Sequence, residues 1–406
     1  MALEAQPNRI KAMQSDFEQS PFVKIVNQNL KGDKLIWLVA LSLSVISILV
    51  VYSATGTLAY RRLQGNTEYY LFKHGILIAL SIFLIWICHQ VDYRYYSRIS
   101  RIALLVSVPL LLLSWKFGVT INEASRWITI PLINQSFQPS DLAKLALIAN
   151  IAAMLAKRQY ELHDFKTSIQ PVLIWTGVIC ALIGLSNFSN AVLLFLTCMM
   201  LIYIGRIPTN YLILMFLVGA TSIMMALYVG ERFGTARSRI EQFTNPEEIH
   251  FQAQQSYIAI ATGGLLGKGP GNSDQKNFLP HPYSDFIYAI ILEEYGLLGG
   301  LLVLGLYVLL LYRGMVVMLG SKLAFGGLLS VGLSFSIVMQ ALLNMCVAVG
   351  LVPITGIPLP MVSMGGTSLL FTGMAIGIIL SVSRGEIDEN VPLGNDTTGT
   401  QNLVKS

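Results

Sequence analysis

Long, uninterrupted runs of apolar residues, separated by short polar segments, recur along nearly the whole chain. Each run is close to the ~20 residues that a helix needs to cross ~30 Å of hydrocarbon. Within lipid, only helices and closed barrels satisfy every backbone polar group, and continuous rather than alternating runs favour helices. We predict ten membrane-spanning helices, at residues 35–55, 71–89, 102–119, 140–156, 169–186, 189–206, 210–230, 285–312, 323–347 and 366–383.

Composition supports this pattern, because the 406 residues are 54% hydrophobic and only 12% charged. A soluble domain carries about 25% charged residues. The sequence therefore predicts an all-α integral membrane protein. Basic loops beside a bilayer explain the net charge of +5, so we expect no nucleic-acid partner. The four cysteines fall inside apolar runs without metal-site spacing, and we expect them to be buried.

The distribution of Lys and Arg predicts that both termini are cytoplasmic. In that orientation sixteen of these residues lie inside and eleven outside, although Arg61 and Arg62 in a short outer loop count against it. Eight of the eleven lie between spans three and four or around a long outer loop at residues 231–284. The predicted regions are a cytoplasmic segment (1–34), a transmembrane domain (35–384) and a disordered cytoplasmic tail (385–406).

The first cluster of polar residues is "INEASRWITIPLINQSFQPSDLAK", residues 121–144. Arg126 precedes an alternating apolar segment, and Ser140 stands where we expect it to cap the following helix. Lys144 lies one turn further along, on the same face. Ionisable groups within a span are costly, so they usually face a cavity or a partner. The alternative is that Arg126 and Lys144 only snorkel to lipid head groups.

The long loop 231–284 carries a second set of cations and many glycines. "ARSRIEQF" contains Arg237 and Arg239, and Lys268 and Lys276 flank the stretch "GKGPGNSDQK". Glycines allow backbone to approach a ligand closely. The stretch does not match the phosphate-binding P-loop pattern, however, and glycines in a surface loop are usually plain turns.

Three carboxylates follow this loop in "LPHPYSDFIYAIILEEYG". Asp285 falls at the expected start of span eight, where it is either a helix cap or a reactive group. Glu293 and Glu294 come eight and nine residues later, about 12–13 Å further along a helix, which is too far for a carboxylate dyad. We expect these two glutamates to hold helices together or to line a polar cavity.

The segment "GLVPITGIPLPMVSMGGTSLL", residues 350–370, interrupts apolar sequence with prolines and glycines. Irregular backbone at membrane depth is tolerated only against protein or water. We therefore expect the segment to line a cavity that opens to the outer side of the membrane, together with the polar clusters described above. The residues assigned to this cavity are Pro358, Pro360, Ser363, Gly365 and Gly366.

Three of these stretches resemble signatures of the SEDS family (shape, elongation, division and sporulation proteins, the FtsW, RodA and SpoVE group). They are "RWITI" followed by "FQPSDLAK", then "LPHPYSDFIYAIILEEYGLLGG", then "GIPLPMVSMGGTSLL". The resemblance covers roughly residues 35–384, and "GNSDQKNFLP" is more similar to the FtsW branch than to RodA. One departure is "SNFSNA", where the family commonly has QPDLGT, so that Asn187 replaces an acid.

The resemblance implies a peptidoglycan glycosyltransferase that polymerises lipid II, in the bacterial inner membrane and at the division septum. Asp285 matches the family's catalytic acid, which favours a general base over a helix cap. The residues expected to bind the substrate and its pyrophosphate are Arg126, Ser140, Lys144, Arg237, Arg239, Lys268 and Lys276. No cofactor is firmly implied, although a divalent cation (Mg or Mn) could assist at the pyrophosphate.

The expected partners are lipid II, a class B penicillin-binding protein (a transpeptidase) and other division proteins. Three alternative functions stay open at this point. The charges could serve a lipid II flippase without bond making, or the chain could be a RodA-like elongation polymerase. It could also be a non-catalytic division scaffold, in which case Asp285 would be dispensable.

Overall fold

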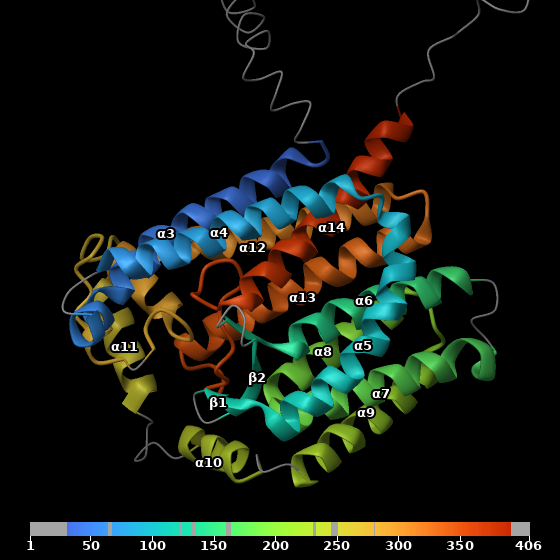
Figure 1. Cartoon of the computed structure of the whole chain (residues 1–406), viewed down its shortest axis with the longest axis horizontal. Helices are drawn as coiled ribbons and strands as arrows, with labels where there is room; N and C mark the ends of the chain where they lie inside the picture. The colour runs from blue at the N-terminus through green and yellow to red at the C-terminus, as the bar shows by residue number, and fades with distance from the viewer. Residues whose placement is uncertain are drawn as a thin grey trace, which may run out of the picture.

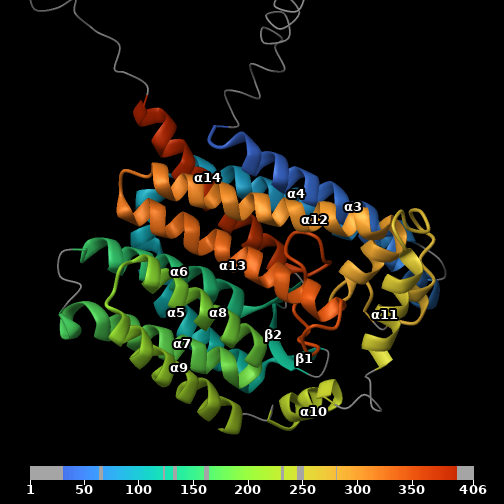
Figure 2. The same cartoon turned by 180° about the vertical axis from the view of Figure 1, so that it is seen from behind.

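The computed structural model describes residues 31–63, 67–121, 124–130, 135–159, 164–229, 233–244, 251–279 and 281–390. These residues form a helical bundle with one small sheet (Figures 1 and 2). The elements are α3 (Lys34–Leu63), α4 (Thr67–Gln90), η1 (Tyr93–Tyr95), α5 (Tyr96–Phe117), β1 (Val119–Ile121), β2 (Ala124–Ile130), β3 (Gln135–Phe137), α6 (Pro139–Lys157), η2 (Phe165–Ile169), α7 (Gln170–Ser186), α8 (Phe188–Ile204), α9 (Thr209–Val229), α10 (Phe233–Thr244), α11 (Phe251–Gly263), η4 (Gln275–Asn277), α12 (Ile287–Gly320), α13 (Ala324–Ala348) and α14 (Thr367–Asn390).

A helix stands at each of the ten predicted spans. Within the described part of the chain, eight helices are long and apolar enough to cross a membrane. At the sixth and seventh predicted spans the apolar helices are shorter, Phe188–Ile204 and Thr209–Ser222. The predicted fold class, an all-α membrane protein, is confirmed. The count of ten crossings stays a prediction.

Both ends of the described chain lie at one end of the bundle, and β1, β2, α10 and α11 lie at the other (Figures 1 and 2). At the first end, Asp33 joins three helices. Its backbone N–H donates to Ser383 Oγ at 2.9 Å, its Oδ1 caps α3 by accepting from Leu35 N at 2.8 Å, and Arg313 Nε donates to its Oδ2 at 2.7 Å. This cluster fixes the start of α3 to α12 and α14.

Helices α4 and α14 pack closely because α14 presents glycine to α4. A Cβ atom on Gly373 would lie 2.4 Å from Ser81 Oγ, and one on Gly377 would lie 2.7 Å from the carbonyl oxygen of Ile85. Two glycines four residues apart form the small-residue stripe that lets membrane helices approach through their backbones. Any larger side chain at either position would force α4 and α14 apart.

Several boundaries differ from the sequence prediction. The segment between α5 and α6 contains a three-stranded antiparallel sheet in the order β1-β2-β3, formed by the apolar alternation after Arg126. The expected cap by Ser140 is wrong, because Gln138 occupies the N-cap position of α6 without a side-chain cap bond. Helix α14 continues to Asn390, and residues 1–30 and 391–406 lie outside the described part.

Helix α12 is broken at Gly296, whose φ of 67° and ψ of −168° are not helical. The broken turn leaves backbone groups that the loop after α11 satisfies. Lys268 N and Gly269 N donate to the carbonyl oxygens of Glu293 and Glu294, both at 2.9 Å, and Leu297 N donates to Gly264 O at 2.9 Å. Unpaired backbone groups are costly within a membrane, so this exchange makes the break tolerable.

The glycines of this loop are required by close packing. A Cβ on Gly263 would lie 2.0 Å from Leu292 O, one on Gly267 would lie 2.2 Å from Glu294 O, and one on Gly296 would lie 2.4 Å from Leu265 O. The glycine-rich stretch therefore lies against the backbone of α12.

Candidate active site

The site is built around the irregular segment between α13 and α14, residues 353–366, which we call the α13–α14 loop. Its carbonyl oxygens accept hydrogen bonds from side chains of several helices. Ser47 Oγ on α3 donates to Val362 O at 2.7 Å, Gln340 Nε2 on α13 donates to Pro358 O at 3.1 Å, and the Tyr307 hydroxyl on α12 donates to Pro360 O. These donors replace the missing secondary structure and hold the loop inside the bundle.

Asp285 lies in the turn that precedes α12 and is partly exposed. Its Oδ1 accepts from Ser284 Oγ at 2.9 Å, and a Cβ on Gly356 would lie 3.5 Å from its Oδ2. The carboxylate therefore lies against the α13–α14 loop. The helix-cap alternative is wrong, because Phe286 occupies the N-cap position of α12 and no side chain caps that end.

The turn that carries Asp285 is bonded to the same loop. Ser363 Oγ donates to Ser284 O at 2.6 Å, and Met364 N donates to Tyr283 O at 2.9 Å. From α13, Asn344 Nδ2 donates both to Asp285 O at 2.9 Å and to Ile357 O at 2.8 Å. The backbone around Asp285 is thus held from the loop side and from the helix side.

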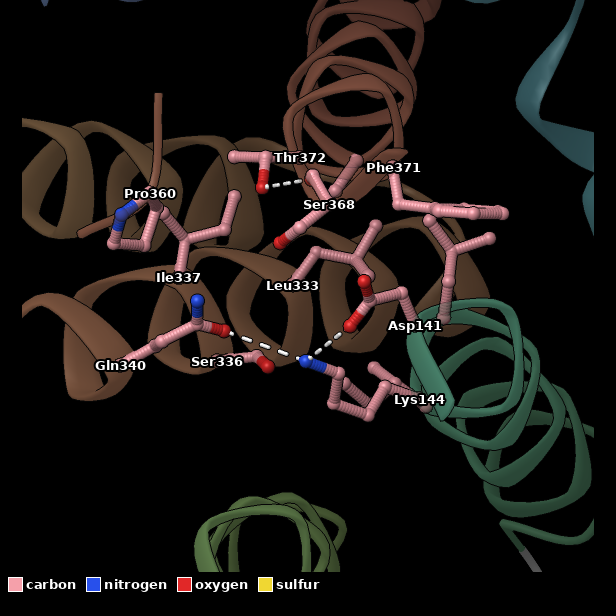
Figure 3. Close-up of a pocket in the computed structure, with 13 residues that line it drawn as sticks. Asp141, Lys144, Leu333, Ser336, Ile337, Gln340, Pro360, Ser368, Phe371 and Thr372 are labelled. Carbon is pink, nitrogen blue, oxygen red and sulfur yellow. Dashed lines mark hydrogen bonds and ion pairs between the residues drawn. The ribbon is translucent and has the colours of Figure 1, made fainter. Parts of the chain in front are cut away.

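Lys144 lies at a small cavity of about 50 Å³ beside this loop (Figure 3). The side chain comes from α6, and its Nζ lies 2.8 Å from Asp141 Oδ1 and 3.4 Å from Gln340 Oε1. Pro360 and Thr372 are among the other lining residues. The cavity can hold water but is small for a sugar ring. Lys144 is 8% exposed, so its ammonium group does not snorkel to the membrane surface.

The predicted substrate-binding cations fall into three groups. Arg239 on α10 reaches the α13–α14 loop, where its Nη1 donates to Ile354 O at 3.1 Å. Arg126 lies in β2 and Arg237 in α10, but both side chains lie outside the described part. Lys268 and Lys276 bind elsewhere: Lys268 contacts Glu293 and Asp274, and Lys276 Nζ donates to Gly271 O at 2.6 Å. Ser140 accepts a hydrogen bond from Gln138 Nε2 at 2.8 Å.

Glu293 and Glu294 are buried at the break in α12, with exposed fractions of 0% and 1%. Glu293 accepts from Lys268 Nζ at 2.8 Å, from Ser273 Oγ at 2.5 Å and from two backbone amides of the loop. Glu294 accepts from Ser53 Oγ on α3 and from Ser273 N at 3.4 Å. The two glutamates therefore attach the loop after α11 to α12 and α3.

Lys268 is the cation that contacts the acidic side chains where the loop after α11 meets α12. Hydrogen bonds to Asp274 and then Glu293 raise the pKa of Lys268 above its ordinary value. The same contact with Lys268 lowers the pKa of Asp274. Both groups are therefore charged at neutral pH, and the positive charge of Lys268 is directed at the buried carboxylate of Glu293.

Sequence reasoning missed two polar residues of the site, Gln340 and Asn344 on α13. Both lie in an apolar span and are separated by four residues, which places them on one helix face. That spacing was the available signal, because polar side chains inside a span usually face a protein partner or a cavity.

Asn187, which the resemblance places where the family commonly has an acid, caps a helix. It lies between α7 and α8, and its Oδ1 accepts from Asn190 N at 3.3 Å. Asn and Asp cap helices about equally well. An amide at this position therefore makes the same capping contact that a carboxylate would make.

The described residues do not by themselves form a ligand cage for a divalent cation, so a cation held at the pyrophosphate stays a prediction. Among the described residues, no three His, Cys, Asp or Glu side chains gather in a group that could hold a metal. Asp141, the acidic residue at the cavity, is already paired with Lys144. The site provides the carboxylate of Asp285 against the α13–α14 loop, Arg239 bonded to the same loop, and Lys144 at the cavity beside it.

Comparison with known proteins gives consistent results along most of the chain. The sequence model of the cell cycle protein family of FtsW, RodA and SpoVE matches residues 33–387. A Coxiella burnetii protein named probable peptidoglycan glycosyltransferase FtsW is 33% identical over 364 residues, covering 86% of this chain and 95% of the relative. Stage V sporulation protein E of Bacillus subtilis is 32% identical over 358 residues, covering 87% and 97%.

Two solved structures share the fold. Rod shape determining protein RodA of Thermus thermophilus is 23% identical, with a TM-score of 0.64 and coverage of 87% of this chain and 97% of that one. A chain from a structure described as "Structural coordination of polymerization and crosslinking by a peptidoglycan synthase complex" is 22% identical, with a TM-score of 0.69 and coverage of 87% and 98%.

Proposed function

This chain belongs to the cell cycle protein family of FtsW, RodA and SpoVE, and we propose that it is a peptidoglycan glycosyltransferase that polymerises lipid II. Relatives at 31–33% identity carry the name probable peptidoglycan glycosyltransferase FtsW. The observation that supports the mechanism is the position of Asp285. Its partly exposed carboxylate does not cap α12 and lies against the α13–α14 loop, which Lys144 and Arg239 approach from other helices.

In the proposed reaction, a hydroxyl oxygen of the acceptor sugar attacks the anomeric carbon of the donor sugar. The hydroxyl proton passes to the carboxylate of Asp285 as the new glycosidic bond forms. The bond between the anomeric carbon and the pyrophosphate oxygen breaks, and the pyrophosphate leaves with the electron pair. Because the substrate's lipid lies in the bilayer, its sugars lie near the membrane surface.

Lys144 and Arg239 are the described cations that can stabilise the leaving pyrophosphate. Lys144 is already paired with Asp141. A phosphate group would therefore either compete with that carboxylate for the ammonium group or share the ammonium group with it. Such preorganised charge stabilises a transition state more than mobile charge does. Arg126 and Arg237 stay predicted members of this group. We assign Lys268 and Lys276 instead to folding the loop, on the strength of their contacts.

We further propose a class B penicillin-binding protein as partner. A chain of similar fold comes from a peptidoglycan synthase complex that coordinates polymerization with crosslinking, and a transpeptidase would supply the crosslinking. A role at the division septum, contacts with other division proteins and cytoplasmic termini are part of the same proposal. Relatives named FtsW and stage V sporulation protein E are about equally similar, so the proposed division role rests on the FtsW-like stretch "GNSDQKNFLP".

The experiment is polymerisation of lipid II in detergent by the purified protein, compared with Asp285→Asn. The amide keeps the size of the side chain but cannot accept the proton, so the rate should fall about 10²–10⁴-fold. Gln254→Ala, an exposed change on α11, serves as the control and should polymerise at the parent rate. Glycan formation in detergent, where no second leaflet exists, excludes a pure flippase, and an active Asp285→Asn protein would refute the assignment of the base.

A further inference from the structure

Asn344 makes two hydrogen bonds that join the turn of Asp285 to the α13–α14 loop. The residue is 1% exposed, and its Nδ2 donates to Asp285 O at 2.9 Å and to Ile357 O at 2.8 Å. An amide nitrogen carries two hydrogens, so these contacts use its full donor capacity. Because both partners are carbonyl oxygens, which can only accept, the nitrogen and not the oxygen must face them.

The amide oxygen of Asn344, in contrast, makes no hydrogen bond of this kind within the described part of the chain. Asn344 Oδ1 is buried and has no hydrogen-bond partner among the described residues. An apolar side chain of similar size would remove this unpaired acceptor, but it would also leave the carbonyl oxygens of Asp285 and Ile357 without the donor that Asn344 supplies. The amide at this position is therefore explained by what it donates to these two carbonyls. The two donated bonds are what an apolar residue could not supply.

The position of Asn344 relative to Gln340 links the proposed base to a proposed cation. Gln340 precedes Asn344 by four residues, about 6 Å along the same helix face. Its Nε2 donates to Pro358 O at 3.1 Å, while its Oε1 accepts from Lys144 Nζ at 3.4 Å. One face of α13 therefore holds two consecutive carbonyls of the loop. It connects Lys144 to the loop at one position and Asp285 to the loop at the next.

The turn of Asp285 needs such support because the helix that follows does not provide it. No side chain caps the N-terminus of α12. The carboxylate of Asp285 has one hydrogen-bond donor among the described residues, the neighbouring Ser284 hydroxyl. The main-chain carbonyl of Asp285 is instead fixed by Asn344 from a helix that is distant in sequence.

We propose that Asn344 is a positioning residue for Asp285. It fixes the main chain of the base against the α13–α14 loop, and thereby sets the place of the carboxylate relative to the cations. This inference rests on the proposed function, since it assumes that Asp285 is the base. Asn344 itself does not touch the reacting atoms. A displacement of about 1 Å of a catalytic group can lower the rate about 10²-fold.

The first test is Asn344→Leu in the purified full-length protein, with Ser334→Ala as the matched control. Ser334 is a buried polar residue on the same helix, and its hydroxyl donates within that helix to Ser330 O at 2.8 Å. In lipid II polymerisation, Asn344→Leu should lower kcat about 10–100-fold. KM should stay near the parent value, because the cations remain. Ser334→Ala should match the parent in both constants.

The second test combines Asn344→Leu with Asp285→Asn. If Asn344 acts through the base, its loss should have no further effect on the residual rate once the base is removed. An equal fractional loss in both backgrounds would overturn the inference and leave Asn344 a structural residue. The same holds for a raised KM with unchanged kcat.

The outcomes separate this inference from the proposed function. An Asp285→Asn protein that polymerises at the parent rate refutes the base, and the inference falls with it. A slow Asp285→Asn protein together with a fully active Asn344→Leu protein refutes the inference alone. If Asn344→Leu does not fold, Asn344→Gln replaces it, because the amide is kept but displaced by one methylene. A parent kcat in that variant would equally overturn the proposal.

Discussion

Removing the positive charge of Lys268 tests whether the loop after α11 binds substrate or seals the break in α12. Lys268 Nζ lies 2.8 Å from Glu293 Oε1, and Glu293 is fully buried. Removing one partner of a buried ion pair typically costs about 3–5 kcal/mol, because the other charge stays buried alone. The side chain of Lys268 is 26% exposed and Glu293 keeps three other donors. We therefore expect Lys268→Met to lower the free energy of unfolding by about 2 kcal/mol.

The assay is thermal unfolding in detergent together with steady-state polymerisation of lipid II. Lys276→Met is the matched control, because it removes the same charge from the same loop but leaves Glu293 paired. Its effect should stay within about 0.5 kcal/mol. Adding Glu293→Gln to Lys268→Met removes the stranded carboxylate, so the double variant should be more stable than Lys268→Met alone.

The sequence-based interpretation of Lys268 as a substrate ligand makes the opposite forecast. It expects KM for lipid II to rise while the unfolding midpoint stays at the parent value. That result, or a double variant less stable than Lys268→Met, would refute the structural role that we assign to Lys268.

Three further predictions follow from other parts of the structure. Asn187→Asp should keep the cap of α8 and near-parent activity, whereas Asn187→Ala should cost about 1 kcal/mol in thermal unfolding, and a total loss of activity in the Asp variant would contradict the capping role. Because Asp274 and Glu293 raise the pKa of Lys268 above its ordinary 10.5, the ion pair stabilises fully below that value and is lost as pH rises through the raised pKa. The difference in unfolding midpoint between parent and Lys268→Met should therefore shrink at strongly alkaline pH and stay constant between pH values of about 6 and 9. In intact cells an impermeant thiol reagent should label Gln254→Cys but not Thr397→Cys, and the reverse pattern would invert the proposed topology.

The sequence predicts a helix at each expected span because a long apolar helix needs only local information, a continuous apolar run of sufficient length. The position of Asp285 just before α12 and the cavity next to Lys144 follow from local signals too, a carboxylate at a span boundary and a lysine inside a helix. The break at Gly296 does not follow. Within "EEYGLLGG" that glycine looks like an ordinary residue of an apolar helix, and the exchange of backbone bonds that makes the break tolerable involves a loop about thirty residues earlier.

Charge alone also does not show which anion Lys268 contacts. The sequence suggests the anionic lipid as its partner, but in the structure its Nζ contacts Glu293 and Asp274. Which anion a lysine meets depends on how the loop folds onto the helix, and that depends on glycines whose close contacts cannot be read from the chain. The same limit applies to Asn344, whose acceptors lie 59 residues before it and 13 residues after it.

The α13–α14 loop and the break in α12 solve one physical problem in two ways. Irregular backbone at membrane depth must find donors and acceptors within the protein. At Gly296 the partner is the backbone of the loop after α11. Backbone-to-backbone hydrogen bonds fix both segments, which suits a purely structural contact. At the α13–α14 loop the partners are side chains of Ser47, Gln340 and Asn344. Ser47 lies on α3, and Gln340 and Asn344 lie on successive turns of α13. A backbone held by side chains from several helices is placed by the packing of those helices. The proposed base stands at the loop of this second kind, where its position is set by the helices and its carboxylate stays free to react.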